Sequence, residues 1–294
     1  ASGGTQAASS ATQRAPSTTD MLDAPVTPVS FDQAVSRAGT DLFSQARTGL
    51  GTEPRTLVID PLIDGKTGAQ TASTVQMGEQ LAAQIKARYP NWKVLPLTRE
   101  SLDTKPLLLI GTLSSFSTAQ VTDSVPDTYR MWVSLIDLRD RTIVAKRVDH
   151  ATASSVNAEP LPYYRDSPSW HKDKTVNAYI NSCQRDTQIG DRANDDYIDR
   201  LYAVATINEA TTAYDKASYA SAKKLYQEAE KLAAPGDLRV LNGLYLTSWK
   251  LGQVDDAQSA FSKLVASGIE SRQLPLKLLF QPGRVSYVEA GDLP

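Results

Sequence analysis

Apolar residues recur at helical spacing directly after Ser30. Ser30 and Gln33 form the pattern of a capping box, with Ser30 as the N-cap. The apolar positions that follow lie on one helical face: Ala34, Val35, Ala38, Leu42 and Ala46. Glycines at positions 49 and 51 end this pattern. The sequence therefore predicts that order begins at Ser30 with a helix.

The next hundred residues predict one more helix and five strands. The helix runs from about Ser73 to Arg88, and the strands cover 55–60, 92–97, 107–113, 129–138 and 142–148. The last two strands alternate apolar and polar residues across the turn Arg139-Asp140-Arg141, which predicts a hairpin. Pro96 predicts an edge strand or an early strand end. We therefore expect an α+β module over 30–153, with helices on a small mixed or antiparallel sheet.

Five segments of this module resemble one family of envelope proteins. They are Thr56–Leu62, Met77–Ala82, Trp92–Arg99, Leu109–Leu113, and Val133–Asp137 with Ile143–Ala145. In this order they resemble the FlgO, LpoB and CsgG envelope lipoproteins and the amino-terminal domain of TolB. The resemblance covers about 100 residues and lacks the family's usual Thr-Gly hairpin turn. It implies a non-enzymatic adaptor, scaffold or regulatory module at the bacterial outer membrane.

The first 29 residues have a different composition from the module. Twenty of them are Ala, Ser, Thr, Gly or Pro, without periodicity or aromatic residues. Such a segment buries too little apolar surface to offset chain entropy, so we expect a disordered tether over 1–29. It is either an expression linker or the arm of a lipoprotein whose acylated cysteine precedes Ala1.

Residues 154–190 combine prolines with large aromatic side chains. Pro160, Pro162 and Pro168 lie close to a cluster of Tyr163, Tyr164 and Trp170. Proline stiffens a chain, so we expect an extended clamp between two domains rather than a swinging linker. The aromatic side chains either pack onto the α+β module or form a surface that binds a partner protein.

A helical domain is expected over 191–270, because two segments repeat at a spacing of 35. Tyr214, Ala217, Tyr219, Ala222 and Tyr226 correspond to Trp249, Gly252, Val254, Ala257 and Phe261. The pattern resembles the tetratricopeptide repeat, although the first helix of each unit departs from it. The alternative is an ordinary bundle of helical hairpins. Tyr214 and Trp249 are candidate partner contacts, with both rings packing between helices as the alternative.

The last segment, 271–294, begins like a strand. Leu276–Gly283 followed by Val285, Tyr287 and Val288 resembles the opening strand of an OmpA-like peptidoglycan-binding domain. The Asp and Arg that hold the peptidoglycan peptide in that family are absent. The resemblance implies a domain cut at Pro294 and peptidoglycan attachment in a longer protein.

Chemistry-bearing residues form no strong catalytic pattern. Gly65-Lys66-Thr67 follows a strand as in a phosphate-binding loop, but the first glycine of that motif is replaced by Asp60. His150 and His171 have no catalytic or metal-ligand spacing, and we expect them on the surface or in loops. Cys183 is expected to be a buried, unpaired thiol near a helix start. Asp191, Asp195, Asp196 and Asp199 are expected to form a charged helical face rather than a calcium loop. We therefore predict no catalytic residue, no cofactor and no metal.

Composition narrows the function. The net charge of −2, from 31 basic and 33 acidic residues, disfavours a nucleic-acid binder. The sequence has no run of about 20 apolar residues, so it predicts no transmembrane helix. We expect a non-enzymatic periplasmic lipoprotein, anchored to the outer membrane, that acts as a scaffold through contacts with envelope proteins. The alternative is a cell-wall enzyme or a nucleotide-dependent envelope factor that uses the Gly65 loop.

Overall fold

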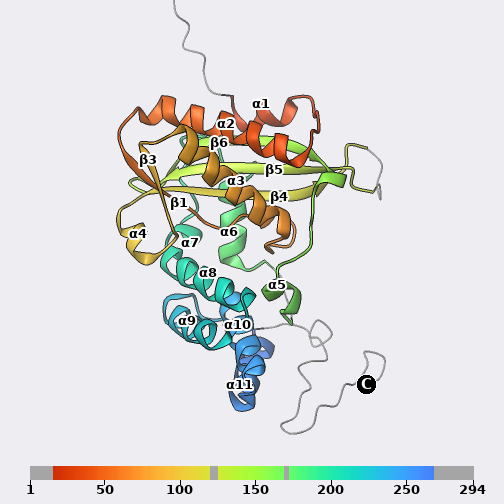
Figure 1. Cartoon of the computed structure of the whole chain (residues 1–294), viewed down its shortest axis with the longest axis vertical. Helices are drawn as coiled ribbons and strands as arrows, with labels where there is room; N and C mark the ends of the chain where they lie inside the picture. Colours follow the sequence, from red (N-terminus) through yellow and green to blue (C-terminus); the bar gives the residue numbers. More distant parts are fainter. Residues whose placement is uncertain (1–15, 120–124, 169–171, 268–294) are drawn as a thin grey trace, which may run out of the picture.

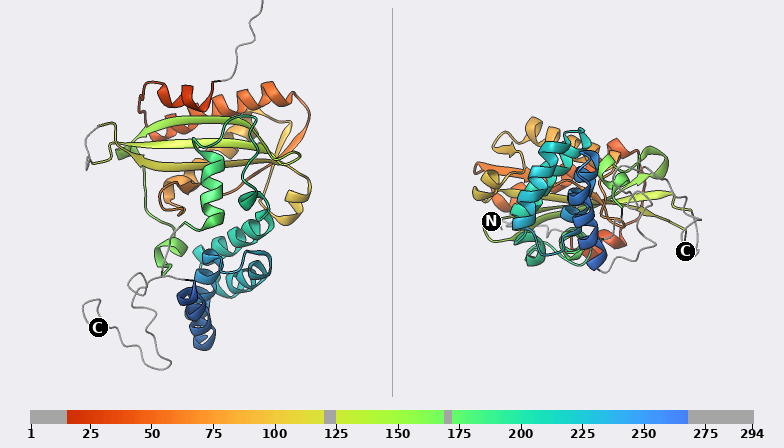
Figure 2. Two further views of the ribbon diagram at one scale, coloured as in Figure 1. Left: turned by 180° about the vertical axis from the view of Figure 1, so that it is seen from behind. Right: turned by 90° about the horizontal axis from the view of Figure 1, so that it is seen from below.

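A computed structural model describes residues 16–119, 125–168 and 172–267. It shows an α+β fold in which one mixed sheet carries helices on both faces, and a group of helices extends beyond one side of it (Figure 1). The predicted fold class is confirmed. The α+β part and the helical part are in direct contact over the described residues, as two further views show (Figure 2).

The sheet has six strands. They are β1 (Arg55–Ile59), β2 (Ile63–Asp64), β3 (Trp92–Leu95), β4 (Leu107–Phe116), β5 (Thr128–Asp137) and β6 (Thr142–Thr152). The strand order is β3-β1-β4-β5-β6, with β2 paired to the far end of β4. Strands β3, β1 and β4 are parallel, and β4, β5 and β6 form an antiparallel meander. Strand β3 lies at the edge and ends before Pro96, as proline requires.

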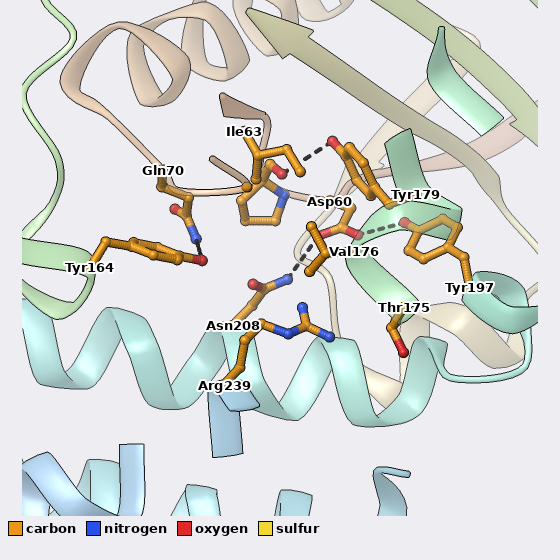
Figure 3. Close-up of a pocket in the computed structure, with 12 residues that line it drawn as sticks. Asp60, Ile63, Gln70, Tyr164, Thr175, Val176, Tyr179, Tyr197, Asn208 and Arg239 are labelled. Atoms are coloured by element: carbon orange, nitrogen blue, oxygen red, sulfur yellow. Dashed lines mark hydrogen bonds between the residues drawn. The ribbon is translucent and has the colours of Figure 1, made fainter. Parts of the chain in front are cut away.

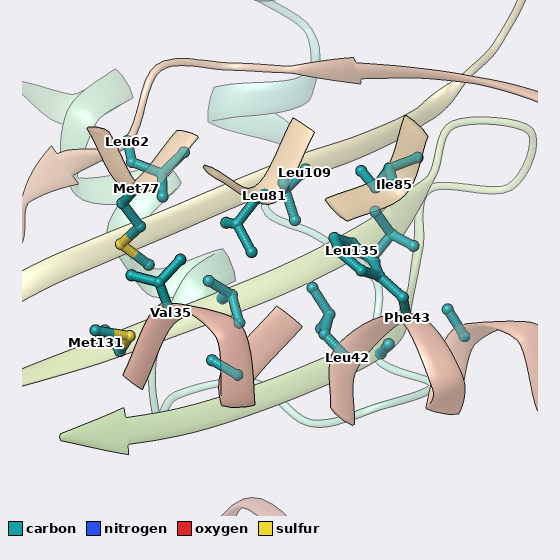
Figure 4. Close-up of a cluster of buried hydrophobic side chains, with 14 of the residues drawn as sticks. Val35, Leu42, Phe43, Leu62, Met77, Leu81, Ile85, Leu109, Met131 and Leu135 are labelled. Atoms are coloured by element: carbon teal, nitrogen blue, oxygen red, sulfur yellow. The ribbon is translucent and has the colours of Figure 1, made fainter. Parts of the chain in front are cut away.

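Two helices cover one face of the sheet. Helix α2 (Phe31–Leu50) starts at the predicted N-cap, where Ser30 accepts from the Gln33 amide, and α3 (Ala72–Arg88) starts at Thr71. Both pack apolar faces onto the odd-numbered positions of β4 and β5. The resulting core is closely interdigitated (Figure 4): Val35, Leu42, Phe43, Met77, Leu81, Ile85, Leu109, Met131 and Leu135.

The opposite face is covered by α6 (Lys174–Cys183), together with α7 (Asp195–Ile198) and the start of α8 (Leu201–Asp215). Their buried residues join the even-numbered positions of β4 and β5, such as Leu108, Ile110 and Trp132. Cys183 is buried as predicted, but it is the last residue of α6 and not near a helix start. The short helix α4 (Arg99–Asp103) lies between β3 and β4.

The helical part consists of two hairpins. Helices α8 and α9 (Tyr219–Leu232) form the first, and α10 (Leu238–Lys250) and α11 (Val254–Ala266) form the second. The two turns have the same geometry at the predicted spacing. Ala217 and Gly252 both have positive φ, and the next amides donate to Ala213 O and Ser248 O respectively. These backbone hydrogen bonds are those of the Schellman motif, which ends a helix at a residue of positive φ.

The expected disorder of 1–29 is wrong for its described part, 16–29. Helix α1 (Thr18–Asp23) has a capping box at Ser17, and Met21 is buried. Thr18 donates to Thr187 O at 2.9 Å, and Val29 pairs with Ala151 at the edge of β6. Because the segment has few apolar residues, its sequence pattern does not reveal these few contacts. Residues 1–15 lie outside the described part.

The 154–190 segment is not extended throughout. A 3-10 turn (Ala153–Ser155) lies at its start, and it contains α5 (Pro162–Asp166) and α6. Its residues 157–161 run beside 70–73, where Ala72 N donates to Glu159 O and Leu161 N donates to Gln70 O. His150 is also misplaced by the sequence analysis, because it lies within β6 and is 9% exposed. His171 lies outside the described residues.

Candidate functional site

The carboxyl ends of β1 and β4 are where a ligand would be expected. After β1 the chain forms β2, which pairs with β4, and then passes through α3 to β3 on the other side of β1, whereas β4 continues directly into its antiparallel neighbour β5. In open α/β sheets, ligands bind in the crevice formed at such a reversal of strand order. In this protein, side chains from the helical part enter that crevice (Figure 3). We call Asp60, Tyr179, Tyr197, Asn208 and Arg239 the junction cluster.

Asp60 is the centre of the junction cluster. It follows β1 directly and is only 4% exposed. Its carboxylate accepts hydrogen bonds from the Tyr197 hydroxyl and, at 3.0 Å, from Asn208 Nδ2. Burial raises the pKa of Asp60, although the two hydrogen bonds and the charge of Arg239 act in the opposite direction. Each oxygen of this buried carboxylate accepts one hydrogen bond, and together they link β1 to α7 and α8.

Tyr179 of α6 closes the crevice from the other side. Its hydroxyl accepts from Gly111 N at 2.9 Å and lies 3.0 Å from Gly111 O and 3.2 Å from Pro61 O. The single hydroxyl proton serves one of these carbonyls at a time. The Tyr179 and Tyr197 rings meet edge to face at 5.2 Å. Burial raises the pKa of both hydroxyls, so they remain protonated donors.

Gly111, whose backbone bonds to Tyr179, is required for the packing of Leu62 on strand β4. A Cβ at this position would come within 2.8 Å of Leu62 Cδ2 and 2.9 Å of Trp132 O. These distances are shorter than ordinary van der Waals contact, so a side chain there would displace Leu62. The glycine therefore leaves the room that Leu62 occupies against strand β4.

Arg239 enters the same crevice from the first turn of α10. The side chain is 10% exposed, and its Nη2 lies 3.7 Å from Asp237 Oδ2, which is too long for a hydrogen bond. Burial disfavours the charge, but the carboxylates of Asp237 and Asp173 outweigh it and raise the pKa of Arg239. The guanidinium is therefore a fixed positive charge between the two parts of the chain.

The remaining cavity is small. It is lined by Asp60, Gln70, Tyr164, Thr175, Tyr197 and Arg239, among others, and has a volume of about 20 Å³. That volume corresponds to about one water molecule. Metabolite-sized pockets are usually 300–1,000 Å³, roughly fifteen or more times larger. In this conformation the protein's own side chains occupy the crevice.

The four predicted contact residues that the structure describes are not brought together as one exposed surface. Tyr163 is fully buried in the core of the helical hairpins, where its hydroxyl donates to Arg239 O at 2.6 Å. Tyr214 is 2% exposed, and its hydroxyl donates to Asp166 at 2.8 Å. Neither ring can touch a partner directly in this structure, which corrects both expectations. Their size and hydroxyl partners suit the interior.

The other three candidates have different positions. Tyr164 is half-buried, and its hydroxyl accepts from Gln70 Nε2 at 3.4 Å beside the junction cavity. Trp249 is half-buried against the hairpin core, with Lys250 Nζ 5.3 Å from its ring. Trp170 lies outside the described residues. Tyr163 packs on the helical part and not on the α+β module, so the expectation of packing on the module is wrong for this residue.

The backbone amides of the Gly65 loop form hydrogen bonds within the loop itself. Asp64 Oδ1 accepts from Lys66 N at 2.7 Å and from Thr67 N at 3.0 Å, and Lys66 Nζ bonds to Ser115 Oγ at 2.8 Å. Helix α3 begins only at Ala72. A phosphate-binding loop instead presents free amides at a helix start. The geometry here is an Asx turn.

An open groove lies beside the junction cluster. It has a volume of about 520 Å³ between the carboxyl ends of β1 and β3 and the surface of α8 and α9. Ile59, Pro61 and Leu97 line it from the sheet, and Thr212, Ala213, Ser218 and Ser221 line it from the helices. We call it the sheet–helix groove. It is the part of this region with room for a macromolecular segment.

Comparisons with known proteins give no match: no protein-family model, curated protein or solved structure matches this chain. Within the described ranges, no group of three or more His, Cys, Asp or Glu residues is arranged to hold a metal ion. No helix of the described part is long and apolar enough to cross a membrane.

Sequence reasoning missed most of the junction cluster. In the sequence, Asp60 stands out only as the residue in place of the first glycine of a phosphate-loop pattern. An aspartate directly after a buried strand is a usable signal, because that position lies at the carboxyl edge of a parallel sheet. Tyr197, Asn208 and Arg239 gave no comparable signal, since they lie 137 or more residues from Asp60.

Proposed function

We propose that this chain is a non-enzymatic adaptor of a bacterial cell-envelope assembly that binds envelope proteins. The observation that carries the proposal is the self-filled crevice at the carboxyl ends of β1 and β4. The place where an α/β fold usually holds its ligand is used here to attach the helical part. Such a use of the crevice favours a scaffold over a catalyst.

The envelope setting of this proposal rests on resemblance. The strand and helix segments of 30–153 resemble the envelope lipoproteins named above, and the hairpins resemble tetratricopeptide repeats. Under this proposal the protein lies in the periplasm, is attached to the outer membrane through an amino-terminal lipid, and reaches peptidoglycan through a carboxy-terminal continuation. The sheet–helix groove is the surface that we assign to a protein partner, because it combines an apolar floor with a polar rim.

Site-specific photo-crosslinking in the source bacterium tests the adaptor role. A photoreactive residue replaces Ser221 in the sheet–helix groove, and a matched variant carries it at Ser44 on α2, which is exposed on another face. We expect adducts with envelope proteins from the Ser221 position and none from Ser44. Equal labelling from both positions, or adducts confined to cytoplasmic proteins, would contradict the proposal.

The catalytic alternative has a separate test. Thermal unfolding of the purified chain is followed with and without nucleotides and divalent metal ions. The adaptor proposal predicts no change in melting temperature, because the amides of the Gly65 loop are already bonded to Asp64. A ligand-dependent rise would support a nucleotide-dependent factor, since a ligand that binds only the folded state raises stability.

A further inference from the structure

Arg239 presents two buried donors to the junction cavity. Nε and Nη2 form one edge of the guanidinium, where two parallel N–H groups can grip a single acceptor or a pair of oxygens. Neither nitrogen has a hydrogen-bond acceptor among the described protein atoms. The side chain is nine-tenths buried, and the close-up shows it at the wall of the cavity (Figure 3).

An acceptor is needed at this edge. Leaving buried donors unpaired costs free energy, and nearly all buried polar groups in native proteins are bonded to protein or ordered water. The nearest charged partner, Asp237, lies 3.7 Å from Nη2 and also caps α10 by accepting from the Arg239 and Val240 amides. Asp237 is therefore held in place by the helix start.

Size and charge select the occupant. A cavity of about 20 Å³ excludes nucleotides, sugars and amino acids, and leaves water or a monatomic ion. Asp237, Asp173 and Asp60 all act electrostatically on Arg239, so negative charge already surrounds this guanidinium. A halide would be repelled by these carboxylates. Water both accepts from the guanidinium and donates to a carboxylate.

We propose that the junction cavity is a binding site for one ordered water molecule that accepts from Arg239 Nε and Nη2 and donates to the Asp60 carboxylate. The water joins α10 to the carboxyl end of β1. It thereby extends the direct bonds of Tyr197 and Asn208 to the second helical hairpin. This inference stands independently of the proposed envelope role.

Crystallography of the whole chain tests the site. At a resolution that shows ordered water, we expect one spherical peak within hydrogen-bond distance of both Arg239 nitrogens and of Asp60. A parallel bromide soak, read by anomalous scattering, is expected to leave the site without a bromide peak. A bromide peak there, or a guanidinium turned to bond directly to Asp60 or Asp237, would overturn the proposal.

A pair of variants tests whether Arg239 holds the water. Arg239→Met keeps the apolar stem and removes the donors, and we expect the peak to disappear. Arg141→Met is the matched control, because Arg141 bonds to exposed Asp195 and Asp199 at the surface, and it should leave the peak in place. An unchanged peak in Arg239→Met would refute the assignment. If that variant does not fold, the wild-type crystal and the bromide soak still decide.

Discussion

Single residues fix the helix ends and the junction in this protein. Ala217 has a φ of 59° and Gly252 a φ of 70° at equivalent turns. The left-handed conformation crowds a Cβ, which alanine has and glycine lacks. The first hairpin therefore carries backbone strain that the second avoids.

Replacing Ala217 by Gly should relieve this strain. We expect Ala217→Gly to raise the free energy of unfolding by up to about 1 kcal/mol. The greater entropy of glycine in the unfolded chain offsets part of this gain. Gly252→Ala should lose about 1 kcal/mol for the same reason. Urea unfolding of both variants checks the pair. A loss in Ala217→Gly together with no loss in Gly252→Ala would contradict the shared turn geometry.

The hydroxyl of Tyr197 should matter far more than that of an exposed tyrosine. Tyr197→Phe removes a donor to buried Asp60, and we expect a loss of about 1.5–3 kcal/mol in unfolding free energy. Tyr202→Phe removes a similar bond to Asp103 at the surface and should change stability little. Equal effects of the two variants in urea unfolding would mean that Asp60 is not a buried junction residue.

Asp215 should give stability a recognisable pH dependence. Burial raises its pKa to about 6, the Tyr163 amide lowers it, and nearby Asp166 raises it again. The folded state therefore holds this proton above the unfolded pKa near 3.8, and stability is lost as pH rises from about 4 to about 6.

The comparison uses Asp215→Asn, which keeps an acceptor for Tyr163 N. We expect the variant to gain stability relative to wild type as pH rises through that window, and no further gain above it. Chemical unfolding at several pH values measures the difference. A constant difference between pH 4 and 7, or one of opposite sign, would show that Asp215 ionises normally.

Elements meet closely where small residues allow it. Between the two hairpins, Gly243 of α10 faces Tyr226 of α9, and a Cβ on Gly243 would lie 2.3 Å from the Tyr226 ring. The Tyr226 ring is fully buried, and its hydroxyl shares a hydrogen bond with Thr211 Oγ1 at 2.9 Å. The two hairpins can pack only if position 243 has no side chain.

Gly243→Ala should therefore push α9 and α10 apart. Overpacking of this kind costs about 1–3 kcal/mol, whereas alanine is normally favoured over glycine in a helix. Gly49→Ala in α2 is the control, because its Cβ would meet nothing within 4 Å and should not destabilise. Thermal unfolding of the two variants separates packing from propensity. Stabilisation by both would refute the close contact.

Most elements of the α+β part were predictable from local pattern. The alternation in 129–138 and 142–148 and the capping residue Ser30 specify β5, β6 and the start of α2 directly. Helix α1 has a local signal in the capping box of Ser17 and Asp20, but the contacts of Met21 and Thr18 that hold it on the sheet part are distant in sequence and appear in no local pattern. The positions of Tyr163 and Tyr214 were misjudged for a related reason: aromatic spacing predicts a shared face but not its burial.

At the scale of the whole molecule, the junction cluster joins two parts that contact each other directly. Asp60 lies at the end of β1 and Tyr197 on α7, which covers the sheet, while Asn208 and Arg239 belong to the two hairpins. Apart from Asp60, the sequence does not reveal the site, because its residues are far apart in the chain and come from both parts of the fold. Our central claim is that this junction fixes the helical hairpins rigidly relative to the sheet, as a scaffold requires.

The distance between two spin labels, measured by double electron–electron resonance, tests this claim most directly. Labels are placed at Ser44→Cys on α2 and Gln258→Cys on α11, both exposed positions, in a chain where buried Cys183 is replaced by Ser. A rigid junction predicts one narrow distance distribution, which broadens when Asp60→Ala removes the acceptor for Tyr197 and Asn208. A broad or multiple distribution in the parent chain, unchanged by Asp60→Ala, would contradict the account.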